Sequence, residues 1–351
     1  MQISFELFTV NKRFPLTISR GTTAASTNIW LRLEAEGISG WGEASSFSLS
    51  PSHKYTTPEL ISQLQTISTQ LEKFHPLERQ KIHQFLSTIA ITSPVKAAID
   101  VALQDWLGKS LAMPLWRLWG LDVETIPQLS LTIGISTPEL AQARLKNWQT
   151  ILDIPIIKVK MGNPDGIAAD KAMFLAIRAL APSTPITVDA NGGWQLTEAI
   201  AMSQWLANQG VEYLEQPLST KDESDLAKLH QESPLPIFVD ESCCNSTDLL
   251  RLAPYIDGVN LKLMKTGGLT EIMNMIQIAK TLDKQIMYGC YSDSSLANTA
   301  MSHLAPLVDY LDLDSHLNLT DDPFVGATVK AGKLIPPDLP GLGVKHRGNQ
   351  N

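Results

Sequence analysis

The spacing of hydrophobic residues divides the chain into two unlike parts. Up to about residue 50, hydrophobic and polar positions alternate, as in residues 3–7 and 28–34, and this alternation predicts β-strands. Residues 19–27 lie between these segments and are polar and small, so we expect a mobile loop there. From residue 57 to about residue 119 the spacing is helical. The first part therefore predicts an α+β domain over residues 1–124.

The second part alternates short β-rich runs with longer helical stretches. Eight runs occur, at residues 129–134, 156–160, 186–189, 211–215, 237–240, 258–262, 286–290 and 310–314. Each carries a polar residue near its C-terminal end: Thr132, Lys160, Asp189, Glu215, Asp240, Lys262, Cys290 and Asp312. Their spacing of about 25 residues is that of one strand, one helix and two loops. We predict a (β/α)8-type barrel over residues 125–320, with its site at the C-terminal strand ends. Residues 321–351 are expected to return to the N-terminal domain.

The composition of the chain excludes several classes of protein. The chain is 44% hydrophobic and 18% charged, which excludes intrinsic disorder. Its net charge of −8 and the lack of a basic cluster argue against nucleic-acid and anionic-membrane partners. The sequence contains no uncharged stretch of about 18 residues, so we expect no membrane span. Its first residues lack a signal-peptide pattern. The three cysteines, Cys243, Cys244 and Cys290, form a poor disulfide framework, so we expect a cytoplasmic protein.

Three lysines are candidates for proton transfer and charge stabilisation. Lys158 and Lys160 share the second run, and because side chains alternate along a strand they face the same way. Inside a barrel they need an anionic partner, whereas on an exposed strand they would simply be solvated. Lys262 ends the sixth run, which lies opposite the second run in an eight-stranded ring. Lys160 and Lys262 would then flank one substrate carbon, unless Lys262 is a surface lysine. We interpret the nearby Lys265 as structural.

Three consecutive runs end in an acid, namely Asp189, Glu215 and Asp240. A single acid at a strand end often caps the following helix. Three neighbouring carboxylates at one barrel mouth repel each other unless a cation joins them. Oxygen ligands alone favour a hard ion such as Mg²⁺, so the sequence predicts a magnesium site.

The motifs Lys-Val-Lys, Asp-Ala-Asn, Glu-Gln-Pro, Asp-Glu-Ser and Asn-Leu-Lys-Leu-Met-Lys at these run ends resemble those of the enolase superfamily, in its muconate-cycloisomerase-like subgroup. The resemblance extends to residues 40–44 and 340–343 and so covers nearly the whole chain. It implies a modified TIM barrel under an α+β capping domain. It further implies one Mg²⁺ per subunit, which binds the substrate carboxylate while a base removes the α-proton. Such barrels often form homo-oligomers, and the sequence leaves the oligomeric state open.

The eighth run resembles the Asp-x-Asp motif of dipeptide epimerases through Asp312 and Asp314. In that family the pair binds the α-ammonium of a dipeptide; the alternative for this chain is an acidic surface turn. The same resemblance implies substrate contacts at Thr132, Cys290 and Ser292.

The resemblance implies Mg²⁺-dependent epimerisation of the C-terminal residue of an L-Ala-Glu-like dipeptide. A proton would pass between Lys160 and Lys262 through an ene-diolate, with Lys158 opposing its negative charge. Arg20 is the only charge in residues 19–27, and we hypothesise that it contacts an acidic substrate side chain. Three enzyme alternatives stay open: an o-succinylbenzoate synthase, a muconate-type cycloisomerase and an N-acylamino-acid racemase. A catalytically silent barrel with a binding role is a further alternative.

Overall fold

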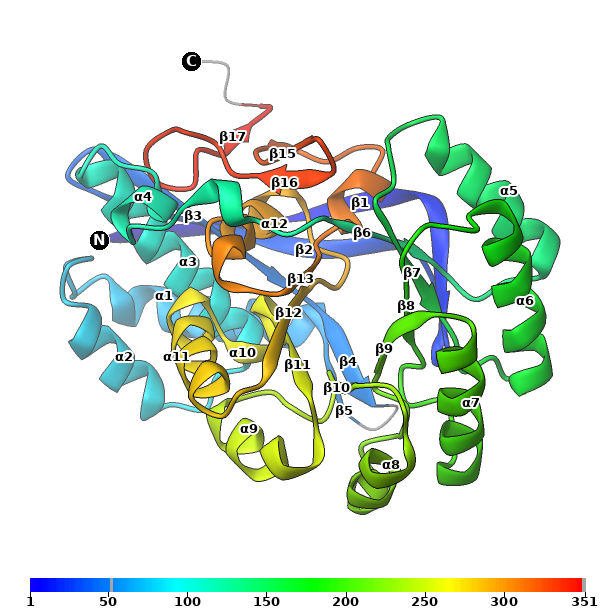
Figure 1. Ribbon diagram of the computed structural model, residues 1–351. Coiled ribbons are helices and arrows are strands. Elements are labelled where there is room, and N and C mark those ends of the chain that lie inside the picture. The colour runs from blue at the N-terminus through cyan, green and yellow to red at the C-terminus, as the bar shows by residue number, and fades with distance from the viewer. Residues whose placement is uncertain (51–52, 349–351) are drawn as a thin grey trace.

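The computed structural model describes residues 1–50 and 53–348 (Figure 1). The N-terminal part begins with a three-stranded antiparallel sheet of β1 (Gln2–Ile18), β2 (Gly21–Ala35) and β3 (Ile38–Ser45). It continues with β4 (Phe47–Ser50), β5 (His53–Tyr55), α1 (Thr57–Leu71), α2 (Arg79–Ser87), α3 (Ser93–Ser110) and α4 (Leu115–Leu118). The apolar face of β2 packs against α1 and α3, so the N-terminal sheet and helices share one core. The α+β architecture predicted for this part is confirmed.

The prediction of a mobile loop at residues 19–27 is wrong. Strand β2 already begins at Gly21, and Ile18 pairs with Gly21 across a tight turn that contains Ser19 and Arg20. A run of small polar residues is typical of a loop. A hairpin strand that is partly exposed to solvent can nevertheless form without alternating hydrophobic residues. The pairing register shifts between Asn11 and Leu16, so a bulge interrupts the hairpin at that point.

The second part is a parallel eight-stranded sheet in sequential order. Its strands are β6 (Ser130–Ile133), β7 (Ile156–Lys160), β8 (Ile186–Asp189), β9 (Val211–Glu215), β10 (Ile237–Val239), β11 (Gly258–Lys262), β12 (Gln285–Gly289) and β13 (Tyr310–Asp312). A parallel bridge between Leu129 and Leu311 joins the last strand to the first and closes the ring. The predicted (β/α)8-type barrel is therefore confirmed.

Helices surround this sheet (Figure 1). They are α5 (Pro138–Gln149), α6 (Ile167–Leu180), α7 (Leu196–Asn208), α8 (Leu226–Glu232), α9 (Ser246–Leu252), α10 (Leu263–Thr266), α11 (Leu269–Thr281) and α12 (Ser295–Ser302). Short 3₁₀ helices are η1 (Val123–Thr125), η2 (Glu223–Asp225), η3 (Ala253–Tyr255), η4 (Ala305–Leu307) and η5 (Ser315–Asn318). In residues 1–50 and 53–348, no helix combines the length and apolar character that a membrane crossing requires.

Four strands end earlier than their runs predict. Strands β6, β10, β12 and β13 stop at Ile133, Val239, Gly289 and Asp312, so Asp240, Cys290 and Asp314 lie in the loops that follow. Below the site, the barrel is closed by inward side chains of Tyr213, Phe238 and Met287, which form a buried cluster. Tyr213 and Phe238 stand two positions before Glu215 and Asp240, and Met287 stands two positions before the end of β12, so strand alternation directs them inward beneath the site residues. The floor is filled, and the barrel opens only toward the C-terminal strand ends.

The C-terminal segment contains β14 (Phe324–Val325), β15 (Thr328–Lys330), β16 (Lys333–Ile335) and β17 (Lys345–His346). It contacts the N-terminal part through hydrogen bonds and aromatic rings. The backbone N–H of Leu342 donates to Asp105 Oδ1 at 2.7 Å, and the ring of His346 stacks on Trp41 with centroids 5.8 Å apart. The division of the chain at residues 124 and 320 stays a prediction.

Candidate active site

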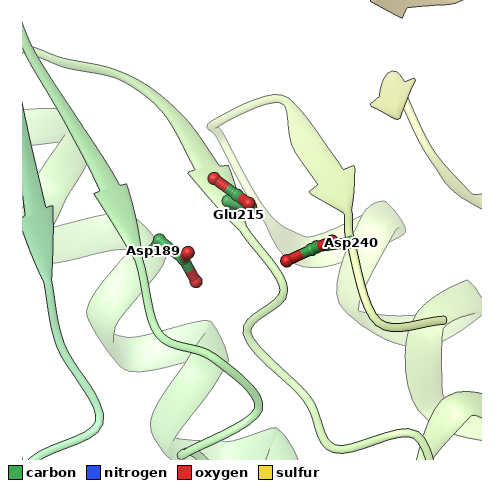
Figure 2. A group of neighbouring side chains, drawn as sticks. All are labelled: Asp189, Glu215 and Asp240. Carbon is green, nitrogen blue, oxygen red and sulfur yellow. The ribbon is translucent and has the colours of Figure 1, made fainter. Parts of the chain in front are cut away.

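Three carboxylates meet at the C-terminal ends of neighbouring strands (Figure 2). Asp189 ends β8, Glu215 ends β9, and Asp240 directly follows β10. The register of β8 against β9 sets Asp189 beside Glu215. One oxygen from each of the three residues lies within 4.8 Å of the others, and all three residues are buried. The predicted acidic residues therefore form one cluster.

The cluster fits a divalent cation. Glu215 Oε2 and Asp240 Oδ2 are buried and accept no hydrogen bond in the described part of the chain, although lysine ammonium groups lie 2.6 and 2.7 Å away. Burial and the charge of Asp189 raise the pKa of Glu215 to about 7. A buried group of three carboxylates, in which acidic neighbours raise the pKa of one member, suits a hard cation with oxygen ligands.

Lysines surround the acids from both sides. Lys158 Nζ lies 2.6 Å from Glu215 Oε2 and 3.6 Å from Asp189 Oδ2. Lys160 Nζ lies 2.5 Å from Asp189 Oδ2, and Lys262 Nζ lies 2.7 Å from Asp240 Oδ2. Both lysines of β7 point inward, as strand alternation predicts. Lys160 and Lys262 come from β7 and β11 and lie on opposite sides of the acidic cluster.

Carboxylates stabilise the charged form of these lysines. Burial opposes the charge of Lys158, but Asp312, Glu215 and Asp189 outweigh burial and hold its pKa well above the ordinary value. Burial likewise opposes the charge of Lys262, and Asp240 is the largest influence that raises its pKa. A proton leaves either group more readily when a cation balances the carboxylates.

Two further side chains hold the acids in place. The fully buried Lys265 Nζ donates to Asp240 Oδ1 at 2.8 Å and to the carbonyl of Asn260 at 2.8 Å. The amide of Asn260 donates in turn to Glu215 Oε1 at 2.7 Å. A Cβ at Gly289 would lie 2.6 Å from that amide, so glycine leaves the room that Asn260 needs. These contacts agree with the structural interpretation of Lys265.

The strand-eight acids lie on the other side of the barrel mouth. Asp312 Oδ2 lies 2.6 Å from Lys158 Nζ, and its Oδ1 accepts from Thr132 Oγ1 at 3.3 Å. Asp314 Oδ2 accepts from the backbone N–H of Thr132 at 2.7 Å. Cys290 Sγ donates to the carbonyl of Asp312 at 3.3 Å. Burial and the charge of Asp312 raise the pKa of Asp314 to about 6.

A cavity of about 580 Å³ lies between the barrel and the N-terminal part. Lys160, Lys262, Cys290 and Ser292 contribute to its wall. Among the described residues, Thr132, Asp312 and Asp314 are not part of this wall. The candidate site therefore has an open part at Lys160 and Lys262 and a more enclosed part at strand eight, where Asp312 forms an ion pair with Lys158.

Sequence reasoning missed two lysines on this cavity wall, Lys12 and the exposed Lys54. Lys12 of β1 donates to Ser292 Oγ at 2.8 Å. No motif marks Lys12, because the bulge that directs it is not visible in the hydrophobic pattern. The sequence suggests a substrate contact for Arg20 but does not reveal its partner within the protein. Arg20 lies 2.6 Å from Glu241 Oε1 and donates to the carbonyl of Asn191 at 2.8 Å. Its contact with a substrate stays a hypothesis, and its charge is already balanced.

Comparison with known families gives a match over most of the chain. Residues 2–120 match the N-terminal domain of the mandelate racemase and muconate lactonizing enzyme family. Residues 139–350 match the family described as enolase C-terminal domain-like.

Curated relatives and solved structures agree with this match. The hydrophobic dipeptide epimerase of Flavobacteria bacterium (strain MS024-2A) is 39% identical and aligns over 98% of this chain and 97% of its own. The L-Ala-D/L-Glu epimerase of Bacteroides thetaiotaomicron is 35% identical, over 98% of this chain and 88% of its own. The crystal structure of the dipeptide epimerase from Enterococcus faecalis V583, complexed with Mg and L-Leu-L-Tyr, superposes with a TM-score of 0.91 at 28% identity, covering 98% of this chain and 99% of that chain. Together with the barrel and its acidic cluster, these matches establish that the chain belongs to the mandelate racemase and muconate lactonizing enzyme family of the enolase superfamily.

Proposed function

We propose that this protein epimerises the C-terminal residue of a dipeptide with the help of Mg²⁺. The observation that carries the proposal is the pair Lys160 and Lys262, which flanks a buried carboxylate cluster from opposite strands. The names of its relatives, two dipeptide epimerases at 39% and 35% identity, support the same reaction. Inversion at one carbon needs a proton donor and a proton acceptor on opposite faces, and this pair supplies both.

Asp189, Glu215 and Asp240 would hold the metal and thereby fix the position of the substrate carboxylate. When bound, a divalent cation supplies positive charge against both the three carboxylates and the charge that develops on the substrate. The α-carbon then lies between Lys160 and Lys262. One lysine, in its neutral form, removes the α-proton, and the other, as an ammonium, returns a proton to the opposite face. Lys158 remains an ammonium and opposes the negative charge of the resulting ene-diolate.

The substrate ammonium would lie at strand eight. A dipeptide spans roughly 7 Å, or two residues of extended chain, which suits the width of a barrel mouth. Asp314 is the more available partner, because Asp312 is already paired with Lys158 at 2.6 Å. Such an ammonium site favours a dipeptide over the substrates of a synthase, a cycloisomerase or an N-acylamino-acid racemase, which lack that charge.

The substrate side chain would point toward the N-terminal part, because the barrel floor is filled by Tyr213, Phe238 and Met287. The cavity wall there includes Leu16, Ile18, Phe47 and Tyr55. Two of the charges on that wall, Arg20 and Glu241, pair with each other. We therefore propose that apolar C-terminal residues are accepted at least as well as the Glu that the sequence suggests.

A dipeptide library in D₂O tests the function directly. We expect mass gain by one deuterium at the α-carbon of the C-terminal residue, with formation of the second epimer. Turnover should disappear after exhaustive chelation and return with Mg²⁺, and Asp240→Asn should not recover it. Full turnover in the chelated protein would overturn the metal assignment. Absence of exchange with every dipeptide would overturn the function.

We also propose a cytoplasmic location for this protein, because its three cysteines are free thiols, which is usual for proteins of a reducing compartment. We further propose a homo-oligomer, which analytical ultracentrifugation would detect.

A further inference from the structure

A bulge in the N-terminal hairpin is fixed to the segment that follows strand eight. Lys12 forms an antiparallel bridge with Leu319, and the backbone N–H of Thr320 donates to the carbonyl of Asn11 at 3.0 Å. On the other side of Lys12, the backbone N–H of Phe14 donates to Asn318 Oδ1 at 2.9 Å, and Asn318 Nδ2 donates back to the Phe14 carbonyl at 2.8 Å. The backbone is therefore hydrogen-bonded on both sides of Lys12, at Asn11 and at Phe14, and these contacts set the position of Lys12.

The ammonium of Lys12 is directed into the cavity. It donates to Ser292 Oγ at 2.8 Å, which uses one of its three N–H groups. Within residues 1–50 and 53–348, no carboxylate oxygen lies within 4.0 Å of it. Burial lowers the pKa of Lys12, and the nearby Cys290, Asp314 and Asp293 offset this effect only in part. Lys12 therefore brings to the cavity a positive charge that has no direct counterion.

The place of this charge identifies the part of the substrate that it faces. Lys12 shares the cavity wall with Cys290 and Ser292, and Cys290 Sγ donates to the carbonyl of Asp312, beside the proposed ammonium site. The first residue of a bound dipeptide carries its side chain on the carbon next to the ammonium. Since the barrel floor is closed, that side chain would extend toward the N-terminal part, whose hairpin carries Lys12.

The local charges then favour one class of first residue. Asp312 is paired with Lys158 before the substrate arrives, and Asp293 accepts from Ser45 Oγ and from the backbone N–H of Tyr291. Asp314 is therefore the carboxylate left to balance both the substrate ammonium and Lys12. A neutral first residue leaves one positive charge unbalanced. A carboxylate side chain on the first residue would balance it through a charge-assisted hydrogen bond to Lys12.

We propose that Lys12 is a specificity-determining residue that selects dipeptides with an acidic first residue. This inference rests on the proposed function and extends it to the N-terminal half of the substrate. A hydrogen bond to a charged group changes binding by roughly ten- to a hundredfold. We expect kcat/KM for Glu-Leu to exceed that for Gln-Leu, its neutral isostere, by about tenfold or more.

The test compares these two dipeptides in wild-type protein and three variants, by α-deuterium exchange and by calorimetric binding with Mg²⁺ present. Lys12→Gln should bring the Glu-Leu to Gln-Leu ratio close to one, and Lys12→Arg should retain most of the preference. Lys54→Gln is the matched control, because Lys54 is an exposed lysine on the wall of the same cavity. It should leave the ratio unchanged. Circular dichroism and Tm would verify that each variant is folded.

Three outcomes overturn the inference. A wild-type ratio near one, with exchange on both dipeptides, overturns the inference and leaves the proposed function intact. A Lys12→Gln variant that improves both dipeptides equally shows that Lys12 only competes with the substrate ammonium for Asp314. Absence of exchange with any dipeptide overturns the proposed function and the inference together.

Discussion

At the scale of single residues, Lys160 and Lys262 should act on opposite faces of the α-carbon. Lys160→Ala should lower epimerisation by at least a thousandfold, which lies within the range for loss of a proton-transfer group, while α-exchange with one epimer persists. Lys262→Ala should show the same loss and exchange only the other epimer. Deuterium incorporation, measured separately for the L,L and L,D dipeptides, distinguishes the two variants. Equal exchange of both epimers by either variant would contradict the two-base arrangement.

Residues whose roles follow from strand alternation were predictable from the sequence. Asp189, Glu215 and Lys160 end consecutive strands in matched register, and their types and spacing already indicate one chemical site. Lys12 was not predictable, because its direction depends on a bulge and on contacts with residues more than 300 positions away. The pairing of Arg20 with Glu241 likewise joins segments distant in the sequence. Long-range contacts that leave no local pattern are what sequence reasoning misses.

At the scale of elements, the end of strand eight should control recognition of the substrate ammonium. Asp314→Asn should raise KM for free dipeptides by about tenfold or more, because the ammonium loses its available counterion. N-acetylated dipeptides should be poor substrates of the wild-type protein, since they lack that charge. The affinity for Mg²⁺ should change little, because Asp314 is not part of the acidic cluster.

Asp312→Asn serves as the contrast to Asp314→Asn. It removes the carboxylate 2.6 Å from Lys158, so it should lower kcat as well as raise KM by disturbing the lysine that opposes the ene-diolate charge. Efficient turnover of N-acyl amino acids would contradict the strand-eight assignment and favour an acylamino-acid racemase.

Elements with a regular hydrophobic period were predicted better than those without one. The eight barrel strands were located to within about two residues, since buried parallel strands are short apolar runs. The hairpin strand at Gly21–Ala35 was partly read as a loop, because its first residues are small and exposed. Strand formation there depends on pairing with β1, which a local pattern does not reveal.

At the scale of the whole molecule, a buried carboxylate joins the N-terminal sheet to the barrel. Glu43 of β3 accepts from Ser294 Oγ at 2.5 Å and from the backbone N–H of Ala297 at 3.2 Å, at the start of α12. Asp293 is fixed to the same sheet through Ser45 Oγ at 2.8 Å. Both contacts lie next to Tyr291 and Ser292, so the junction also positions one wall of the active-site cavity.

This junction should make the stability of the protein depend on pH. Burial and the charge of Asp293 raise the pKa of Glu43 from 4.5 to about 8. Between these values the folded protein holds a proton that the unfolded chain has released, so the free energy of unfolding falls as pH rises through this window.

Glu43→Gln removes the titrating group. We expect Tm to decline less steeply from pH 5 to pH 8 in Glu43→Gln than in the wild type, as measured by thermal unfolding at constant Mg²⁺. Buried acids distant from Glu43, such as Glu215, contribute the same slope to both proteins and cancel in the difference, whereas Asp293 interacts with Glu43 and belongs to the effect that is measured. Glu232→Gln, at an exposed carboxylate of α8, controls for loss of a surface charge and should follow the wild type. Parallel curves for Glu43→Gln and wild type would show that Glu43 is ionised in the folded protein throughout this range.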